Sequence, residues 1–549
     1  MKQGSSTFFN QYGGFSNLLK TGYKYFKGKE QTILKNIDAV NDMQSMTRTS
    51  LGPNGMKKYI INMHDKLFIT KDTNVMATEL DINHPAVNIL VDALKSQNKE
   101  QGDGTNFVIT FGGELLNLAG KLINDGVHIS DISIGFEKAF NKSLELIDSA
   151  PKYTVSDVTN LEEATKIIKP VIGSKLVHGQ ESFLAPIIAE ACINVLPEKK
   201  EKFDVDNVRV AKILGGNLMK SEVMKGLVVV RKTEGSVQKV EKCNVAVYNC
   251  PLETQGAETN DQIVFKTADE LLNYTKGEEQ HMEKLVKDIV DSGVKCVITG
   301  GAISNMAIHY LDKYGIMAFR TMSKFELRRI AKSLGAIMLV RLGAPTKEEM
   351  GYADEIKVTE ISSEKCIVIK KDSENNRLST IVLRGTTNDM LDNLERVIQC
   401  GVNAYRSVCK SPVYVPGAGA IDMFLCEKIK EFGKTVKTLD QYAIDKFGEA
   451  FEVIPRTIAE NSGINVNDII PTLRSKNNQN PTMGLDIKGG VVDDVFNLGI
   501  YDHLETKKWA IRHAYNAVKT IVRIDQIIVA KPSGGPNLAN RPKNEEDEF

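Results

Sequence analysis

The chain has 549 residues and a mass of 60.7 kDa, which is too long for one hydrophobic core and predicts about three domains. Its 70 Lys and Arg residues balance 70 Asp and Glu residues, so the overall charge does not indicate a nucleic acid or a membrane surface as a partner. The eight cysteines form no C-x-x-C pair and indicate reduced thiols. The sequence shows neither the apolar core of a signal peptide nor a run of roughly 18 apolar residues that could span a membrane. We therefore expect a cytoplasmic protein.

The first part of the chain is expected to be mostly helical. Residues 1–30 are rich in glycine, lysine and aromatic residues and are expected to form an extended arm. From Ile33 to Thr47 apolar residues recur every three or four positions, which predicts an amphipathic helix that stops at the glycine turn of residues 49–55. Two short β-type runs, 59–61 and 67–70, then predict a hairpin.

Asp72 follows this hairpin within the polar residues 71–74, which we expect to form a turn at the strand end. A turn-forming aspartate is the simpler interpretation of Asp72 taken alone, and a functional carboxylate is the other.

A second glycine turn separates a helix expected over residues 85–101 from a long helix that continues past Leu122. This turn contains Gly102, Asp103, Gly104, Thr105 and Asn106. Two glycines allow backbone N–H groups to approach a ligand, and a helix N-terminus favours phosphate while a carboxylate holds Mg²⁺. The competing interpretation is that Asp103 or Thr105 only caps the helix.

The middle of the chain changes pattern twice. Residues 149–216 are expected to be mixed helix and loop, with a solvated turn at 198–202. Beyond them, apolar strands at 245–247, 296–298 and 337–340 alternate with helices at 278–292, 303–314 and 324–334, which predicts a separate α/β layered domain. The helix at 324–334 carries bulky apolar and basic residues, so it is either a polypeptide-binding surface or an ordinary solvated amphipathic helix.

The last third begins with a polar turn at 371–377, a strand at 380–385 and a helix at 390–405. A third glycine turn, residues 415–420, opens another helix, and a long helical section is expected to run to Ile521. Residues 532–549 have too little apolar content to fold and are expected to be a disordered tail.

Taken together, these turns resemble those of the group II chaperonins. The segments that carry the resemblance are 49–56, 70–72, 102–105, 415–420 and 442–463. The similarity covers nearly the whole chain, and the segments 509–511 and 523–528 resemble one particular subunit type of the eukaryotic cytosolic chaperonin.

The resemblance implies a multidomain α and α/β fold. A helical equatorial domain would be made from both chain ends, 1–148 and 408–531, and an intermediate hinge domain from 149–216 and 373–407. An α/β apical domain, 217–372, would be inserted between them. Its helical protrusion, or lid, would rise from about residue 251 and return through the helix near Glu278, and the helix at 324–334 would face the client.

The resemblance also implies a function. The chain would be one of several paralogous subunits of a hetero-oligomeric double ring that binds ATP and Mg²⁺. Nucleotide-driven opening and closing of the apical domains would enclose and fold non-native proteins, with actin and tubulin among the clients. No nucleic acid and no membrane partner is expected.

The residues of the implied site come from five segments. Asp103 would hold Mg²⁺, and Asp72 would orient the attacking water. The residues implied to contact the nucleotide are Leu51, Gly52, Pro53, Gly102, Gly104, Thr105, Asn106, Gly417, Gly419 and Asp502.

Three positions depart from the family pattern. The family usually has an aspartate four residues after the Arg of a Glu-Arg pair, as the base for the hydrolytic water, and here Cys400 stands in that place. A thiol with an ordinary pKa of about 8.5 is mostly uncharged at pH 7, so we expect slow hydrolysis. A ring subunit that does not hydrolyse ATP is the alternative. Thr73 replaces a more usual glycine, and Ala418 interrupts what is usually a run of three glycines.

A soluble phosphotransferase of small metabolites is a different class of function. Its phosphate loop would need the pattern G-x-x-x-x-G-K-[ST]. The nearest match, Gly433-Lys434-Thr435, lacks the glycine five positions earlier, which disfavours this class.

Overall fold

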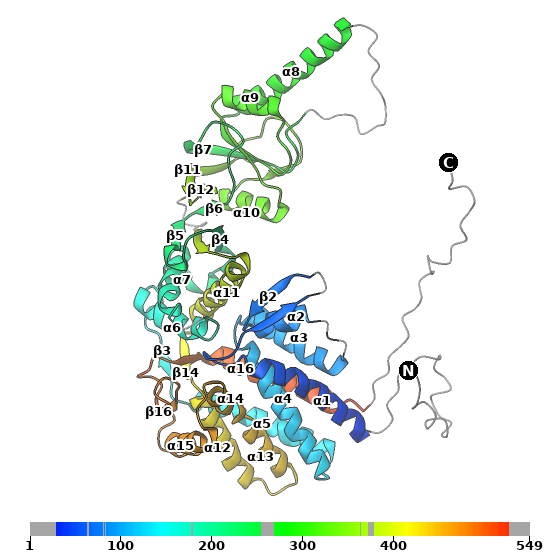
Figure 1. The fold of residues 1–549 in the computed structure, drawn as a ribbon, viewed down its shortest axis with the longest axis vertical. Helices are drawn as coiled ribbons and strands as arrows, with labels where there is room; N and C mark the ends of the chain where they lie inside the picture. Colours follow the sequence, from blue (N-terminus) through cyan, green and yellow to red (C-terminus); the bar gives the residue numbers. More distant parts are fainter. Residues whose placement is uncertain are drawn as a thin grey trace, which may run out of the picture.

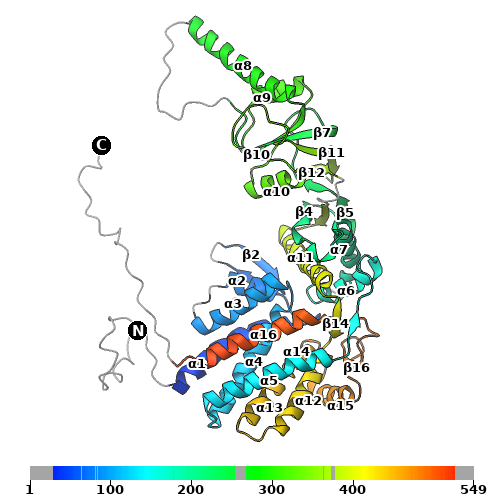
Figure 2. The ribbon, with the colours of Figure 1, turned by 180° about the vertical axis from the view of Figure 1, so that it is seen from behind.

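The computed structural model describes residues 29–62, 65–80, 82, 84–176, 179–253, 268–362, 364–371 and 378–525. The expected tail at 532–549 and almost all of the expected arm at 1–30 lie outside these residues. The molecule is elongated, with a lower, a middle and an upper part (Figure 1). The view from behind shows the same three parts in the same order (Figure 2).

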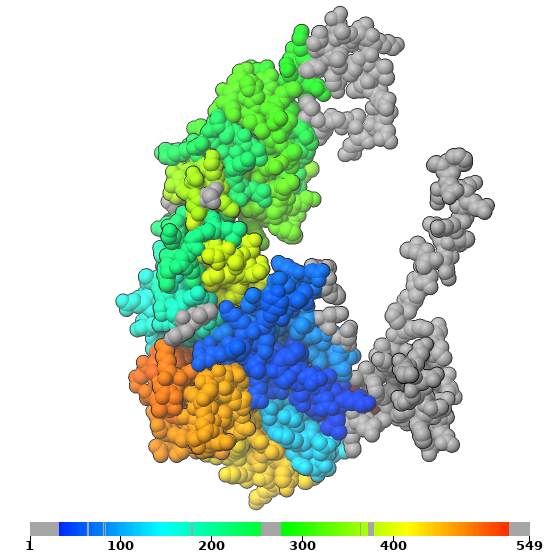
Figure 3. All heavy atoms as spheres, viewed as in Figure 1, coloured from blue at the N-terminus to red at the C-terminus, as the bar shows by residue number. Residues whose placement is uncertain are grey.

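The lower part is a helical body built from both ends of the chain. Its helices are α1 (Lys29–Arg48), α3 (Pro85–Glu100), α4 (Thr105–Asn124), α5 (Ile129–Ser149), α12 (Ala420–Thr435), α13 (Asp440–Ala450), α14 (Val453–Asn461), α15 (Val466–Gln479) and α16 (Leu504–Val522). One hydrophobic cluster joins buried residues of all of them, including Val108 and Leu115 of α4 and Val518 of α16. The space-filling view shows N-terminal and C-terminal segments in one continuous body (Figure 3).

Three small sheets of short strands pack on this helical body. The strands are β1 (Lys58–Ile61) with β2 (Leu67–Thr70), β15 (Met483–Asp486) with β16 (Val491–Asp494), and a three-stranded sheet in the order β17 (Tyr501–His503), β14 (Val413–Pro416), β3 (Tyr153–Thr154). The predicted hairpin β1–β2 is present, with Lys58 opposite Thr70. The section expected to be helical up to Ile521 is mostly helical but also contains β15, β16 and β17.

The turn expected at 71–74 is also different. The chain forms a short helix there, α2 (Thr73–Glu79), which begins directly after Asp72.

The middle part packs three helices beside a small sheet. The helices are α6 (Leu161–Gly173), α7 (Glu181–Val195) and α11 (Asn388–Lys410), the short 3₁₀ turns are η2 (Lys200–Lys202), η3 (Val205–Asn207) and η4 (Leu218–Lys220), and the sheet order is β4 (Val208–Leu214), β13 (Ser379–Gly385), β5 (Glu222–Lys225). Ile168, Ile188 and Ile398, one from each helix, lie in one buried cluster. α11 extends beyond the predicted 390–405 at both ends, and η2 occupies the expected turn at 198–202.

The upper part is an α/β layer structure. Its strands are β6 (Leu227–Val229), β7 (Lys239–Tyr248), β8 (Val294–Thr299), β9 (Met317–Arg320), β10 (Met338–Leu339), β11 (Gly351–Ile361) and β12 (Glu364–Lys370), and its helices are α8 (Ala268–Asp291), α9 (Asn305–Lys313) and α10 (Lys324–Leu334). The sheet order is β6-β12-β11-β7-β8-β9, with β10 paired to β7. The strand expected at 337–340 shortens to β10, and α8 begins ten residues before the expected start at Glu278.

Side-chain alternation along β7 explains why helices cover both faces of this sheet. Val245 and Val247 point to the cluster that contains Leu327 of α10, while Ala246 and Tyr248 join the cluster on the other side with α8 and α9. Successive strand residues point to opposite faces, so the continuous apolar run at the end of β7, residues 245–248, needs a helix layer on each side. The predicted multidomain α and α/β fold is therefore confirmed. In the part that the structure describes, no helix is long and apolar enough to cross a membrane.

Candidate functional site

The turn before α4 is held open by glycines. Gly102 has φ 75° and Gly104, the N-cap residue of α4, has φ 78°, and a Cβ on Gly102 would lie 2.4 Å from Cβ of Asn403 on α11. No side chain caps α4, so the expectation that Asp103 or Thr105 caps this helix is wrong. The amide of Gln97 fixes the turn, because its Nε2 donates to the carbonyl of Asp103 at 2.9 Å.

The carboxylate of Asp103 instead faces a lysine from the middle part. Lys175 Nζ lies 3.3 Å from Asp103 Oδ1 and 3.0 Å from Cys400 Sγ, and the lysine side chain is only 12% exposed. Burial alone would lower the pKa of Lys175, but its interactions with Cys400, Asp103 and Asp72 hold that pKa well above its ordinary value. Sequence reasoning missed Lys175, which follows α6 with no motif around it.

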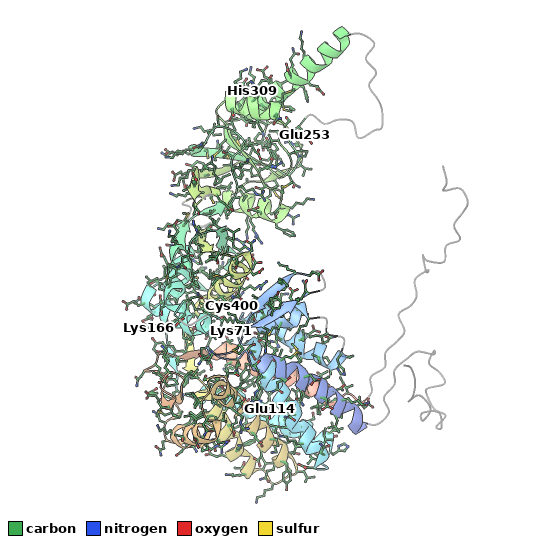
Figure 4. The ribbon with its side chains drawn as sticks, viewed as in Figure 1. Lys71, Glu114, Lys166, Glu253, His309 and Cys400 are labelled. Carbon is green, nitrogen blue, oxygen red and sulfur yellow. The ribbon has the colours of Figure 1, made fainter. Side chains whose placement is uncertain are left out.

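Cys400 lies on α11 and is almost fully buried. Burial raises the pKa of its thiol to about 11, with Asp72 and Asp103 acting in the same direction against the charge of Lys175. The thiol is therefore neutral at pH 7. Figure 4 shows Cys400 near Lys71, where α11 of the middle part approaches the segment after β2.

Asp72 is the N-cap residue of α2, the helix that follows it. Its Oδ1 accepts a hydrogen bond from the backbone N–H of Asn74 at 3.1 Å, so the simpler interpretation, a carboxylate that organises local backbone, applies to one oxygen. The Thr73 hydroxyl is buried and has no hydrogen-bond partner among the described residues.

The turn with Leu51, Gly52 and Pro53 is tied to both neighbouring segments. Gly52 has φ 84°, and the carbonyl of Leu51 accepts from Asn461 Nδ2 at 2.9 Å. The carbonyl of Pro53 accepts from Lys71 Nζ at 2.9 Å, which places this turn beside the residue that precedes Asp72.

The third glycine turn leads into α12. Gly419 is the N-cap residue with φ 78°, and again no side chain caps the helix. Ala418 has φ 51°, a left-handed conformation that costs of order 1–3 kcal/mol for a residue other than glycine. A Cβ on Gly417 would lie 3.3 Å from Asp502 Oδ1, so Asp502 of β17 lines this turn.

A buried lysine behind the site connects two of its segments. Lys507 of α16 lies 2.8 Å from Asp422 Oδ1 and 3.8 Å from Asp502 Oδ2, and its Nζ is 4.2 Å from the ring centre of Phe107 on α4. Burial raises the pKa of Asp502 to about 6, although 42% of its side chain is accessible; the charges of Asp422 and Asp103 act in the same direction and Lys507 opposes them. Sequence reasoning missed Lys507 and Asp422 as well.

Two of the predicted residues have structural contacts. Asn106 donates from Nδ2 to the carbonyl of Thr47 at 3.3 Å and accepts from the Thr110 hydroxyl at 2.9 Å, which joins α1 to α4. Thr105, the first residue of α4, is buried.

These contacts gather the five predicted segments around two helix N-termini. The first N–H groups of α4 and α12 are not capped by side chains, and such ends favour phosphate. Among the described residues no group of three or more His, Cys, Asp or Glu side chains is arranged to hold a metal ion. A single carboxylate such as Asp103 fits Mg²⁺ that is shared with phosphate oxygens, because Mg²⁺ in phosphate sites commonly has one or two protein carboxylates.

Comparison with known proteins identifies the class. The model of the TCP-1/cpn60 chaperonin family matches residues 43–532. The chain therefore belongs to this family and is a chaperonin subunit.

Individual relatives narrow the comparison to one subunit type. T-complex protein 1 subunit theta of Dictyostelium discoideum is 43% identical over 524 residues, which cover 95% of this chain and 97% of that protein. The theta subunit of Homo sapiens is 42% identical over 538 residues, 97% of this chain and 98% of that protein, and that of Arabidopsis thaliana is 40% identical over 526 residues. The expected resemblance to one subunit type of the eukaryotic cytosolic chaperonin is confirmed, and that type is theta.

Proposed function

We propose that this chain is an ATP-binding subunit of a cytoplasmic, hetero-oligomeric double-ring chaperonin that encloses and folds non-native proteins. The observation that carries the nucleotide part is the pair of uncapped helix N-termini at Gly104 and Gly419, with the accessible carboxylate of Asp103 beside the first. ATP would lie between these ends, and Mg²⁺, when bound to Asp103, would neutralise phosphate charge.

The chain's own residues would divide the work. Backbone N–H groups of Gly104 and Thr105 would hold phosphate, and the turn at Gly52 would close over it. Lys175 would supply a positive charge from the middle part. Asp502 would contact the sugar, since it lines the turn at Gly417.

Within this proposal the three parts act as the equatorial, intermediate and apical domains, with boundaries near residues 148, 216, 372 and 407. Lys175 and Cys400 come from the middle part, and Lys175 contacts Asp103 of the lower part. Binding or hydrolysis of nucleotide at Asp103 would therefore alter the contacts between these two parts. A hinge movement at the junction of the middle and lower parts would then close the apical part.

An exposed apolar hairpin supports assembly into a ring. On β1–β2, Ile60 and Phe68 pack inward, while the other face is exposed. The exposed apolar residues are Met56, Tyr59, Ile61, Leu67 and Ile69, with 39–68% of each accessible. Apolar strand surface of this kind marks a contact with another chain, here a paralogous subunit. Native mass measurement of the gently purified complex should give a large hetero-oligomer, and a stable monomer as the only species would contradict the proposal.

The upper part carries exposed apolar residues for a client protein. Met322 and Phe325, at the start of α10, are 69% and 71% exposed. By resemblance, actin and tubulin would be among the clients.

Two alternatives differ from this proposal in specific ways. A ring subunit that binds but does not hydrolyse ATP is favoured by the neutral thiol of Cys400. A phosphotransferase with a phosphate loop at Gly433 has no structural support, because that segment lies in the last turn of α12 and not at the start of a helix.

Asp103→Ala tests the nucleotide site. The variant should lose Mg²⁺-dependent ATP retention, because no other described carboxylate lies in that turn. It should lose only about 1 kcal/mol of stability, since Asp103 caps no helix and its ion pair is partly accessible. Equilibrium binding of labelled ATP with and without Mg²⁺ measures this, and unchanged Mg²⁺-dependent affinity would refute the assignment.

A further inference from the structure

A second charged site lies away from the nucleotide turns, where the upper part meets the middle part. A cavity of about 160 Å³ opens between α10 and the segment of η3 and β4. Four basic side chains line it, Arg209 of β4 and Arg328, Arg329 and Lys332 of α10, with Asp206 as the acidic one. We call it the basic junction cavity.

Like charges face each other across this cavity. Burial lowers the pKa of Arg209, and the positive charge of Arg329 acts in the same direction. Arg209 pairs with Asp206 at 3.4 Å, and the negative charges of Asp206, which is 75% exposed, and of Asp204 act on this pKa in the opposite direction. Among the described residues, neither Arg328 nor Arg329 forms an ion pair.

The structure places these cations together at the junction of two parts of the chain, where a small hydrophobic cluster joins Ile213 of β4 to Val368 of β12. Leu327 and Ile330 of α10 belong to the cluster of the upper part, whereas Val208, next to Arg209, belongs to that of the middle part. Figure 1 shows α10 above β4 at this junction. Bringing Arg209 and Arg329 together is unfavourable where water is excluded, because the repulsion between like charges then strengthens.

We propose that the basic junction cavity binds a compact phosphoryl anion, which stabilises the packing of the upper part against the middle part. Planar guanidinium groups match two phosphate oxygens at once, and Lys332 adds a further positive charge. The cavity is smaller than the roughly 300–1,000 Å³ of sites for drug-sized ligands, so it fits one or a few phosphoryl groups. This site is independent of the proposed ATP site.

Binding of inorganic tripolyphosphate to the full-length chain, in the oligomer in which it is purified, tests the proposal. The parent protein carries Asp103→Ala, so that the probe does not report on the proposed nucleotide turn. Isothermal titration should show binding that weakens at least tenfold in Arg209→Gln/Arg329→Gln. The matched control Lys324→Gln removes a charge from the same helix outside the cavity and should stay within twofold of the parent.

Hydrogen exchange locates the bound probe. Tripolyphosphate should slow exchange in η3 and α10 and leave the start of α4 unchanged, which separates this site from the nucleotide site. Arg209→Lys/Arg329→Lys keeps the charge but loses the planar groups, so it should bind with intermediate affinity. This variant also shows whether loss of binding reflects loss of folding.

Several results would overturn the proposal. These are no binding at millimolar tripolyphosphate, an equal loss in Lys324→Gln, or citrate binding as tightly as tripolyphosphate. Inorganic phosphate and O-phosphoserine, titrated in parallel, distinguish a free anion from a phosphate ester as the source.

Discussion

The variant Cys400→Asp tests whether the thiol at this position limits the rate of the proposed ATP hydrolysis. Burial raises the pKa of the thiol to about 11, so roughly one molecule in 10⁴ carries a thiolate at pH 7. An aspartate at this position would stand beside Lys175, whose Nζ is 3.0 Å from the present sulfur, and that charge would keep it ionised.

The expected gain follows from the contribution of a positioned base. General base catalysis contributes about 10²–10⁴-fold, or about 2.7–5.5 kcal/mol in activation free energy. We therefore expect the hydrolysis rate of Cys400→Asp to rise by at least ~10²-fold. Nucleotide affinity should not rise, because Asp103 and the uncapped helix ends are untouched and the new carboxylate competes for Lys175.

The assay is single-turnover hydrolysis on the assembled complex, with the sites of all other subunits disabled. Cys400→Asn is the matched control, since it has nearly the size of aspartate but no basic group, and it should remain slow. Equal rates for the wild type and Cys400→Asp would refute the reasoning, because another residue would then supply the base. An equal gain in both variants would instead attribute the effect to polarity or packing.

Two other predictions concern the charges behind the site. Lys507→Met should lower the free energy of unfolding by about 3–5 kcal/mol, because it leaves Asp422 buried without its partner, and Lys507→Met/Asp422→Leu should recover most of that loss in urea unfolding. For Asp502, whose folded pKa of about 6 lies above its ordinary value of 3.8, ionisation disfavours the folded state as pH rises from 4 to 6. The unfolding temperature of Asp502→Asn should therefore rise relative to the wild type over that range and level off above it; a difference independent of pH would contradict this.

The glycine turns could be found from the sequence because their cause is local. Gly102 and Gly104 need positive φ, and the apolar periodicity of α4 begins directly after them. The α/β character of the upper part was equally accessible, since β7 is apolar on both faces. The role of Asp72 was ambiguous because an Asx turn and a helix cap use the same hydrogen bond to the N–H two residues later.

Lys175 and Lys507 could not be found in this way. Lys175 is 225 residues from Cys400 in the chain, and only the packing of α11 against the lower part brings it to Asp103. Arg406 of α11 fixes that packing by donating to the carbonyl of Glu100 at 2.7 Å, just before the glycine turn. Neither contact leaves a local pattern in the sequence.

The charges around Lys175 indicate why a thiol at position 400 suits binding better than hydrolysis. With Cys400 neutral, Lys175 faces the carboxylates of Asp103 and Asp72. In our proposal Asp103 would hold Mg²⁺ and Asp72 would orient water when nucleotide is bound. The buried charge of Lys175 would then be available to phosphate, because the thiol of Cys400 is uncharged and forms no ion pair with it. An aspartate there would bind Lys175 in every state and weaken its response to phosphate. Under the proposed function, a cysteine at position 400 would leave Lys175 able to link nucleotide occupancy to the position of the middle part, while the chemical step would be slow.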